Sequence, residues 1–431
     1  MKKFIKIFAL VIVLVFLMFS ACNGAKDPGE TSEDDGFVPE PLLNFQLYNL
    51  KTYVKPIWEG QYVYNETVMF LGADDSARLV YDIGEVLAVM SYDLTKVYEE
   101  NVDYIIDGNY IKRTENSGIP YMQESEYYPS GEASNHYICT DGTHPYILYG
   151  EGETFTRYQV AVTYTHTQKW DGYVPQDESG DLPETIRKLE NKEGLNILFY
   201  GDSITTGCNS SSLINIRPNA DIWPVMVTKA IKEKYGYSQM EKFTDNEKRS
   251  AEQDVDIAEL NEWNITKEND KINYINTAVG GQNSVWANAT YMERVVELEP
   301  DLVFIAFGVN DVSRTTEWYK SQMSLLVTSL KEELPDVEIV LVSPIYPNAV
   351  VSRNNASQSP FLLYQDQFET ELNAVAEENA GVVSAKVTSV YNRVLQNKRY
   401  RDMTGNNINH PNDFGARIYA QAILAALGVS I

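Results

Sequence analysis

The chain has 431 residues, of which 44% are hydrophobic and 12% aromatic, and it includes 29 tyrosines. This length and composition exclude a largely disordered chain and allow two domains of ordinary size. The formal net charge of −26 excludes nucleic acids and anionic lipid headgroups as main partners, because like charges repel. A neutral substrate is compatible with this charge.

The N-terminus has the layout of a secretion signal. Three lysines among the first six residues precede an apolar run over residues 7–19, and two small residues stand directly before Cys22. This layout is typical of a signal peptide, and it resembles a bacterial lipobox, in which the cysteine is lipidated. We therefore expect a signal peptide over 1–21, lipidation at Cys22, a flexible tether over 22–39 and a location on the cell surface. A transmembrane anchor is the alternative, since the run approaches spanning length.

Residues 40–170 consist of short aromatic and β-branched runs that are broken by turn residues. One such run is 61–70 (QYVYNETVMF), and Asp107-Gly108 between two short apolar runs indicates a hairpin. The pattern predicts an all-β domain, a sandwich or a jelly roll. Residues 171–193 are polar and contain two prolines, so they are expected to connect this domain to the next.

From residue 194 onward, apolar runs alternate with helix-like stretches. Such alternation predicts a parallel sheet covered by helices, with functional residues at the carboxyl ends of the strands. The expected strands are 196–200, 272–276, 302–307, 337–342 and 381–385, and the expected helices lie near 221–235, 284–298, 316–333, 362–379 and 413–427. Residues 238–270 fit neither pattern and are expected to be a surface insertion.

The first of these strands runs directly into Gly201-Asp202-Ser203. A serine between a strand and a helix exposes its hydroxyl at the strand end, where its own N–H can face a developing oxyanion. Three further blocks follow in chain order, namely Asn276-Thr277-Ala278-Val279-Gly280-Gly281, Gly308-Val309-Asn310-Asp311 and His410-Pro411. With these four ordered blocks, residues 195–428 resemble the GDSL/SGNH hydrolase family. The resemblance implies a three-layer, flavodoxin-like α/β domain over 194–431 and ester hydrolysis by Ser203.

A serine nucleophile needs a base that takes its proton, and neutral imidazole suits this task. Only four histidines are present, and those at 136, 144 and 166 fall in the predicted β domain, so His410 is the candidate base. The family resemblance assigns two oxyanion donors in addition to the Ser203 N–H, the N–H of Gly281 and the side-chain amide of Asn310. Gly280 is the neighbouring alternative to Gly281.

The third member of the catalytic group departs from the family pattern. The family places an aspartate three residues before the histidine, where this chain has Asn407. The Asn407 amide oxygen can orient the ring but carries no charge to stabilise the imidazolium ion. We therefore favour a Ser–His dyad, with Asn407 as a possible orienting residue. Asp402 or Asp413, reaching the ring from another direction, are alternatives.

The remaining sequence features concern ligands. No His/Cys cluster has metal-ligand spacing, and neither a Walker motif nor a dinucleotide fingerprint is present, so no metal or cofactor is expected. Trp223 and Trp286 lie close in sequence to the catalytic loops and are candidates for binding sugar, although tryptophans are more often core residues. Cys139 and Cys208 are far apart in sequence, which is weak evidence for a disulfide.

An extracellular β-sandwich joined to this hydrolase domain resembles two-domain carbohydrate esterases, which remove acetyl groups from polysaccharides such as xylan. The resemblance implies that the substrate is an acetylated polysaccharide or oligosaccharide. One alternative is a lipid esterase, such as a lysophospholipase, or a thioesterase of the same family. The other is a weakly active, glycan-binding surface lipoprotein.

Overall fold

The computed structural model describes residues 40–244, 260, 262–354 and 358–431. The predicted signal peptide, the lipidation site Cys22 and the tether up to residue 39 lie outside the described residues. Residues Leu42–Ile431 form one compact unit. None of the helices in the described part of the chain is both long enough and apolar enough to cross a membrane.

The C-terminal part of this unit is built on a six-stranded parallel sheet in the order β11-β12-β10-β13-β14-β16. The strands are β10 (Leu195–Gly201), β11 (Gln239–Phe243), β12 (Lys271–Asn276), β13 (Leu302–Ala306), β14 (Glu338–Val342) and β16 (Val382–Ala385). Five of them match predicted strands. The expectation for 238–270 was wrong at β11, which forms an edge strand of the sheet. Its sequence, QMEKF, is largely exposed and therefore lacks the apolar run of a buried strand.

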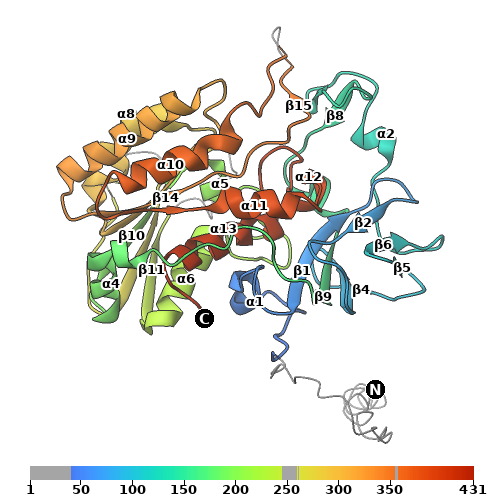
Figure 1. Ribbon diagram of the computed structural model, residues 1–431, viewed down its shortest axis with the longest axis horizontal. Coiled ribbons are helices and arrows are strands. Elements are labelled where there is room, and N and C mark those ends of the chain that lie inside the picture. Colours follow the sequence, from blue (N-terminus) through green and yellow to red (C-terminus); the bar gives the residue numbers. More distant parts are fainter. Residues whose placement is uncertain (1–39, 245–259, 261, 355–357) are drawn as a thin grey trace, which may run out of the picture. The chain divides into compact units, whose positions relative to one another are not determined.

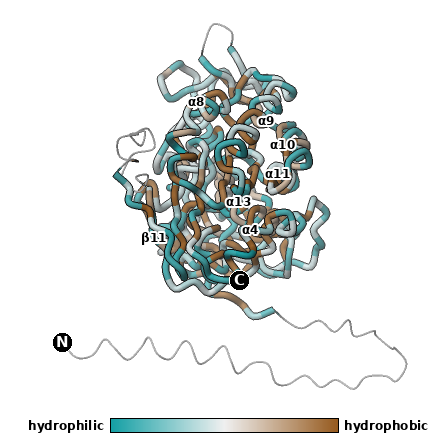
Figure 2. Tube along the Cα trace, turned by 90° about the vertical axis from the view of Figure 1, so that its left-hand side faces the viewer, coloured by the Kyte–Doolittle hydropathy of each residue, from teal (hydrophilic) through white to brown (hydrophobic). Residues whose placement is uncertain are grey.

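Helices cover both faces of this sheet (Figure 1). One face packs against α8 (Ser284–Arg294), α9 (Thr316–Glu333) and α10 (Phe368–Glu377), and the other against α6 (Trp223–Tyr235), α11 (Val387–Leu395) and α13 (Asp413–Ala426). Successive residues of β10 point into the two different cores, as strand geometry requires. In the trace coloured by hydropathy, apolar segments gather in the interior between the labelled helices (Figure 2). This three-layer α/β arrangement is the one predicted.

The N-terminal part contains antiparallel sheets, again as predicted. A four-stranded sheet has the order β1-β9-β3-β4, and two three-stranded sheets have the orders β2-β6-β5 and β15-β7-β8. The strands are β1 (Tyr62–Met69), β2 (Ser76–Arg78), β3 (Val86–Ser91), β4 (Val97–Tyr98), β5 (Tyr104–Asp107), β6 (Tyr110–Arg113), β7 (His136–Cys139), β8 (Tyr146–Leu148), β9 (Gln159–Thr165) and β15 (Val351–Ser352). The hairpin expected at Asp107-Gly108 joins β5 to β6. Three short helices that were not predicted also lie here, α1 (Leu50–Val54), α2 (Glu124–Tyr127) and α3 (Glu153–Thr156).

Buried polar contacts join the two parts. Lys398 and Glu66 form an ion pair at 2.8 Å with both side chains 0% exposed. The Asp402 carboxylate, in the short helix α12 (Tyr400–Met403), accepts the Met69 N–H of β1 at 2.8 Å. Strand β15 comes from the C-terminal half of the chain yet pairs with β7. The domain boundary expected near residue 170 stays a prediction.

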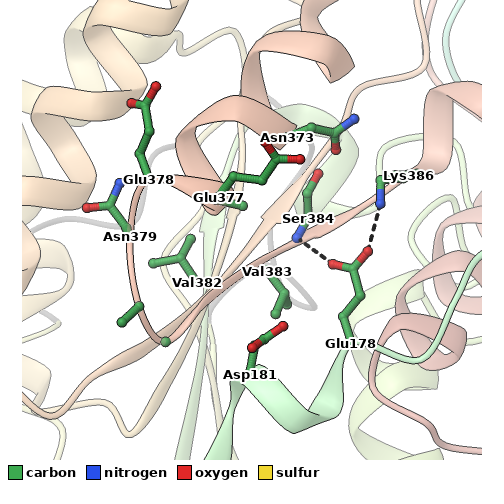
Figure 3. Close-up of a pocket in the computed structure, with 13 residues that line it drawn as sticks. Glu178, Asp181, Asn373, Glu377, Glu378, Asn379, Val382, Val383, Ser384 and Lys386 are labelled. Carbon is green, nitrogen blue, oxygen red and sulfur yellow. Dashed lines mark hydrogen bonds and ion pairs between the residues drawn. The ribbon is translucent and has the colours of Figure 1, made fainter.

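The connecting segment lies against the edge strand β16. The Glu178 carboxylate accepts the Ser384 N–H at 3.2 Å and pairs with Lys386 at 2.7 Å, in a hollow shown in Figure 3. The following helix, α4 (Pro183–Glu190), begins where two of its N–H groups donate to Glu338. The contact with Glu178 occupies the Ser384 N–H of the edge strand β16, where an uncovered strand could pair with another chain.

Candidate active site

Ser203 lies at the carboxyl end of β10, in the middle of the sheet. It begins the four-residue helix α5 (Ser203–Thr206), and the Asp202 carboxylate caps that helix by accepting the Ile204 N–H at 3.0 Å. Position 201 requires glycine, because a Cβ there would stand 2.7 Å from the Ala306 carbonyl oxygen. The close approach of β10 and β13 therefore constrains the backbone just before Ser203.

His410 approaches this serine from the loop before α13. Its Nε2 lies 2.8 Å from the Ser203 Oγ, within hydrogen-bond distance of the proton that a nucleophilic serine must lose. The Asn406 side-chain oxygen accepts the N–H groups of residues 408, 409 and 410, each at 3.0 Å. At the end of the loop, Asn412 caps α13 by accepting the Gly415 N–H. These amide side chains hold the loop in the shape that presents the imidazole to Ser203.

The other ring nitrogen of His410 faces a carboxylate that the sequence motifs did not indicate. Its Nδ1 lies 3.1 Å from Glu151, in the segment between β8 and α3. The Glu151 carboxylate also accepts the Tyr149 hydroxyl at 2.7 Å and the Asn406 amide at 3.2 Å. Burial alone would raise the pKa of Glu151, but the charge and hydrogen bond of His410 and the other donors outweigh it and lower that pKa. The carboxylate is therefore held ionised beside the ring.

The predicted orienting role of Asn407 is wrong. Its side chain accepts the Tyr127 hydroxyl at 2.8 Å and donates to the Leu148 carbonyl at 3.1 Å. Asn407 has a left-handed backbone conformation, with φ 68°, and its side chain bonds to Tyr127 and Leu148 instead of to His410. The alternatives also lie elsewhere, since Asp402 bonds to Arg399 and Met69, and Asp413 accepts the Ser211 N–H.

The residues assigned as oxyanion donors border one cavity together with Ser203 and His410. This cavity has a volume of about 710 Å³ and is lined by Tyr149, Glu151, Gly152, Ser203, Asn209, Leu213, Ile214, Gly280, Gly281, Asn310 and His410. The Asn310 amide donates to the Gln282 carbonyl at 3.0 Å and, over a long 3.4 Å, to Asp202. Gly281 has a φ of 75°, a backbone conformation that favours glycine. Both residues therefore line the cavity that Ser203 and His410 also border.

Two buried carboxyl groups, Asp202 and Asp311, lie next to Ser203 and Asn310 in the sequence. Burial raises the pKa of Asp202 to about 7, although the Ile204 N–H and the charge of His410 oppose the shift. Burial likewise raises the pKa of Asp311 to about 6. Asp311 accepts the Ser284 N–H and hydroxyl, and this contact ties the start of α8 to the loop that carries Asn310.

These features were compared with known proteins. The profile of the GDSL-like lipase/acylhydrolase family matches residues 199–418, which is half of the chain. The chain belongs to this family. It is accordingly a carboxylic ester hydrolase, and the four motif blocks at residues 201–203, 276–281, 308–311 and 410–411 fall within the matched region.

Two solved structures illustrate the likeness of this family member to known proteins. A two-domain esterase active on acetylated mannans is 22% identical over 60% of this chain, with a TM-score of 0.40. The match spans 55% of that esterase, so the chain covers only about half of its length. A catalytic mutant of an acetylxylan esterase from Geobacillus stearothermophilus is 21% identical over 55% of this chain and 95% of its own, with a TM-score of 0.38. A search of curated proteins found no match.

The two tryptophans expected to bind sugar do not line the cavity of this acylhydrolase. Trp223 is 1% exposed, packs against Phe199 and Tyr419, and donates its indole N–H to the Ile204 carbonyl. Trp286 is half-buried against Tyr200 and Phe307. Both tryptophans are therefore packing residues, and the prediction that they bind sugar was wrong.

The metal and cysteine predictions concern the His, Cys, Asp and Glu side chains of the described part of the chain. Within the described ranges, no group of three or more His, Cys, Asp or Glu side chains is arranged to hold a metal ion. Cys139 and Cys208 are both buried and free, so no disulfide joins them.

Proposed function

We propose that this acylhydrolase is an extracellular serine esterase that removes O-acetyl groups from a polysaccharide or oligosaccharide. The observation that carries the proposal is the chain of contacts from Ser203 Oγ to His410 Nε2 at 2.8 Å and from His410 Nδ1 to Glu151 at 3.1 Å. A serine, an imidazole and a carboxylate in this order form the arrangement that activates a hydroxyl for acyl transfer.

In the proposed reaction, Ser203 Oγ attacks the acetyl carbonyl while its proton passes to His410 Nε2. The carbonyl oxygen becomes an oxyanion that accepts hydrogen bonds from the N–H groups of Ser203 and Gly281 and from the Asn310 amide. The intermediate collapses to acetyl-Ser203 as the bond between the acetyl carbon and the sugar oxygen breaks, and His410 donates its proton to that oxygen, so the sugar leaves with a free hydroxyl. Water then attacks the acetyl ester with His410 as base, which releases acetate and restores Ser203.

Glu151 stabilises the imidazolium ion in both steps of this scheme. Replacing an acidic triad residue by its amide lowers kcat by up to about 10⁴-fold in a serine protease, and we expect Glu151→Gln to act in the same direction. Glu153→Gln is the matched control, because Glu153 is exposed and lies two residues away. Glu151→Asp should recover part of kcat if the charge matters, whereas a merely structural role would not distinguish Asp from Gln.

The lining of the cavity supports a short acyl group. Among the described residues that line it, only Leu213, Ile214 and Tyr149 offer larger apolar side chains, and Tyr149 directs its hydroxyl at Glu151. A long acyl chain would need a continuous apolar wall to offset the ordering of its many rotatable bonds. A cavity of about 710 Å³ has room for an acetyl group and a large polar alcohol together.

Hydrolysis of 4-nitrophenyl esters of increasing chain length, with acetate release from acetylated xylan, tests this proposal. We expect acetate release from the polysaccharide, a steep fall in kcat/KM beyond short acyl chains, and no activity in Ser203→Ala. Preference for long chains would move the assignment to lipid esters. Equal rates for the wild type and Ser203→Ala would leave a glycan-binding protein without catalysis.

We also propose that the enzyme is anchored to the outer cell surface through a lipid on Cys22. The basic start, the apolar run and the small residues before this cysteine support the proposal. Metabolic labelling with a fatty acid, for the wild type and for Cys22→Ser, tests it. Labelling of the wild type alone is expected, and equal labelling of both forms would contradict it.

A further inference from the structure

A second hollow on the surface lies next to the active-site cavity. It has a volume of about 720 Å³ and is bordered by the segment before β7, by β7 itself and by residues that follow β15. Its lining consists of Glu132, Ala133, Ser134, Tyr137, Arg353, Asn354 and Phe361. None of these residues lines the catalytic cavity, so the hollow is not a part of the site described above.

Three half-buried aromatic rings connect the two hollows, and we refer to Tyr149, Tyr137 and Phe361 as the aromatic tract. Tyr149 lines the catalytic cavity, and its ring lies edge-to-face with that of Tyr137, with 5.3 Å between their centroids. Tyr137 in turn lies edge-to-face with Phe361 at 5.2 Å. The tract therefore leads from the wall of the catalytic cavity into the second hollow.

A second connection runs through Gln365 to the segment that carries Asn310. The buried Gln365 amide donates to the Phe361 carbonyl at 2.7 Å and, over a long 3.5 Å, to the Val309 carbonyl. Val309 directly precedes the oxyanion donor Asn310. Phe361 is thus linked through Tyr137 to Tyr149, which lines the catalytic cavity, and through Gln365 to the residue before Asn310.

The lining of this hollow combines ring surfaces with polar groups. The Arg353 guanidinium lies 4.4 Å from the centroid of the Phe361 ring, and Glu132 and Ser134 add a carboxylate and a hydroxyl. The Asn354 side chain is already engaged with the backbone of His136 and Ile138. A sugar unit has an apolar C–H face and a rim of hydroxyls, and it can satisfy rings and polar groups together. An acyl chain would offer these polar groups no hydrogen-bonding partner.

We propose that this second hollow is a carbohydrate subsite, which binds a sugar unit next to the one that carries the acetyl group. The inference rests on the proposed deacetylase function and deepens it. Binding energy from a sugar unit that does not react can be used to orient the ester at Ser203. The enzyme should therefore favour acetylated oligosaccharides over small acetyl esters, which cannot reach the hollow.

The test compares two substrates in Phe361→Ala and Tyr137→Ala. The measured quantity is kcat/KM for acetylated xylo-oligosaccharides divided by kcat/KM for 4-nitrophenyl acetate. Loss of one ring from a sugar contact should lower this ratio about tenfold, since tenfold corresponds to about 1.4 kcal/mol. Tyr110→Ala is the matched control, because Tyr110 is an exposed tyrosine on β6 that lines neither hollow. Its ratio should equal that of the wild type.

Thermal unfolding shows which variants fold. If Tyr137→Ala does not fold, the ratio is measured in Phe361→Leu, which removes the ring but keeps an apolar side chain. An unchanged ratio in the folded variants overturns the subsite. A lower preference for long acyl chains in these variants, with no change for the oligosaccharide, also overturns it, because the hollow would then bind the acyl group.

Binding to full-length Ser203→Ala separates the subsite from the chemistry. Calorimetric titration with xylotetraose, mannotetraose and cellotetraose should show binding of at least one of them, and adding Phe361→Ala should weaken it about tenfold. Absence of binding by all three overturns the subsite even if the esterase activity is present. Binding without any ester hydrolysis supports the subsite while the proposed function fails.

Discussion

Asn310→Ala removes the only side-chain donor that we place in the oxyanion hole. The Asn310 amide donates to the Gln282 carbonyl at 3.0 Å and makes only a long contact of 3.4 Å with Asp202, so one of its hydrogens can turn toward an oxyanion. Loss of such a donor lowers kcat by about 10²–10³-fold, or about 2.7–4 kcal/mol. KM for a small ester should change little, because the donor binds the oxyanion more strongly than the ground-state carbonyl.

The same substitution also removes hydrogen bonds within the folded protein, which costs about 1–3 kcal/mol of stability. Asn288→Ala separates the two effects. The Asn288 amide donates to two backbone carbonyls, at 2.9 and 3.0 Å, and does not line the cavity. Both variants are assayed with 4-nitrophenyl acetate at a temperature at which thermal melts show them folded. The reasoning is refuted if kcat of Asn310→Ala stays within about threefold of the wild type, or if Asn288→Ala loses as much.

Three further predictions concern stability. Trp223→Phe should lower the free energy of unfolding by about 1–3 kcal/mol and leave KM for acetylated oligosaccharide unchanged. A large rise in KM would show instead that Trp223 contributes to sugar binding. Lys398→Met should lower the free energy of unfolding by about 3–5 kcal/mol, because it leaves Glu66 charged and buried without its partner. In denaturant titrations, adding Glu66→Gln should recover part of this loss. A single variant as stable as the wild type would contradict the buried ion pair. Asp202, whose pKa is about 7, binds its proton more tightly in the folded than in the unfolded protein. The stability that comes from this proton binding is therefore lost as the pH rises from about 4 to about 7, and the free energy of unfolding falls by up to about 4 kcal/mol. Asp202→Asn should lose less stability than the wild type over this range in melts at each pH, and an equal loss would contradict the raised pKa.

Much of the α/β fold could be predicted because its determinants are local. The buried strands are continuous apolar runs, and each of the first three motif blocks follows one of them directly. The helix predicted over 316–333 coincides with α9. Strand β11 could not be found in this way, because an edge strand with exposed side chains need not be apolar.

The carboxylate that contacts His410 could not be found from the sequence for a different reason. Glu151 lies 259 positions from His410 and outside the region that matches the family profile. The packing of the N-terminal part against α12 and α13 brings the two side chains together. Asn407 was the natural candidate by its spacing, but spacing does not determine the direction of a side chain, and its amide points to Tyr127. Two aromatic residues near the catalytic loops, Trp223 and Trp286, were misassigned for the same reason.

Covalent labelling with a fluorophosphonate, followed by peptide mass mapping, tests the central claim most directly. The reagent forms a bond with a serine oxygen only when a neighbouring base activates it. We expect a single adduct on Ser203, loss of 4-nitrophenyl acetate hydrolysis in proportion to labelling, and neither labelling nor hydrolysis in Ser203→Ala. Hydrolysis that continues in Ser203→Ala, or an adduct on another residue that abolishes activity, would contradict the account.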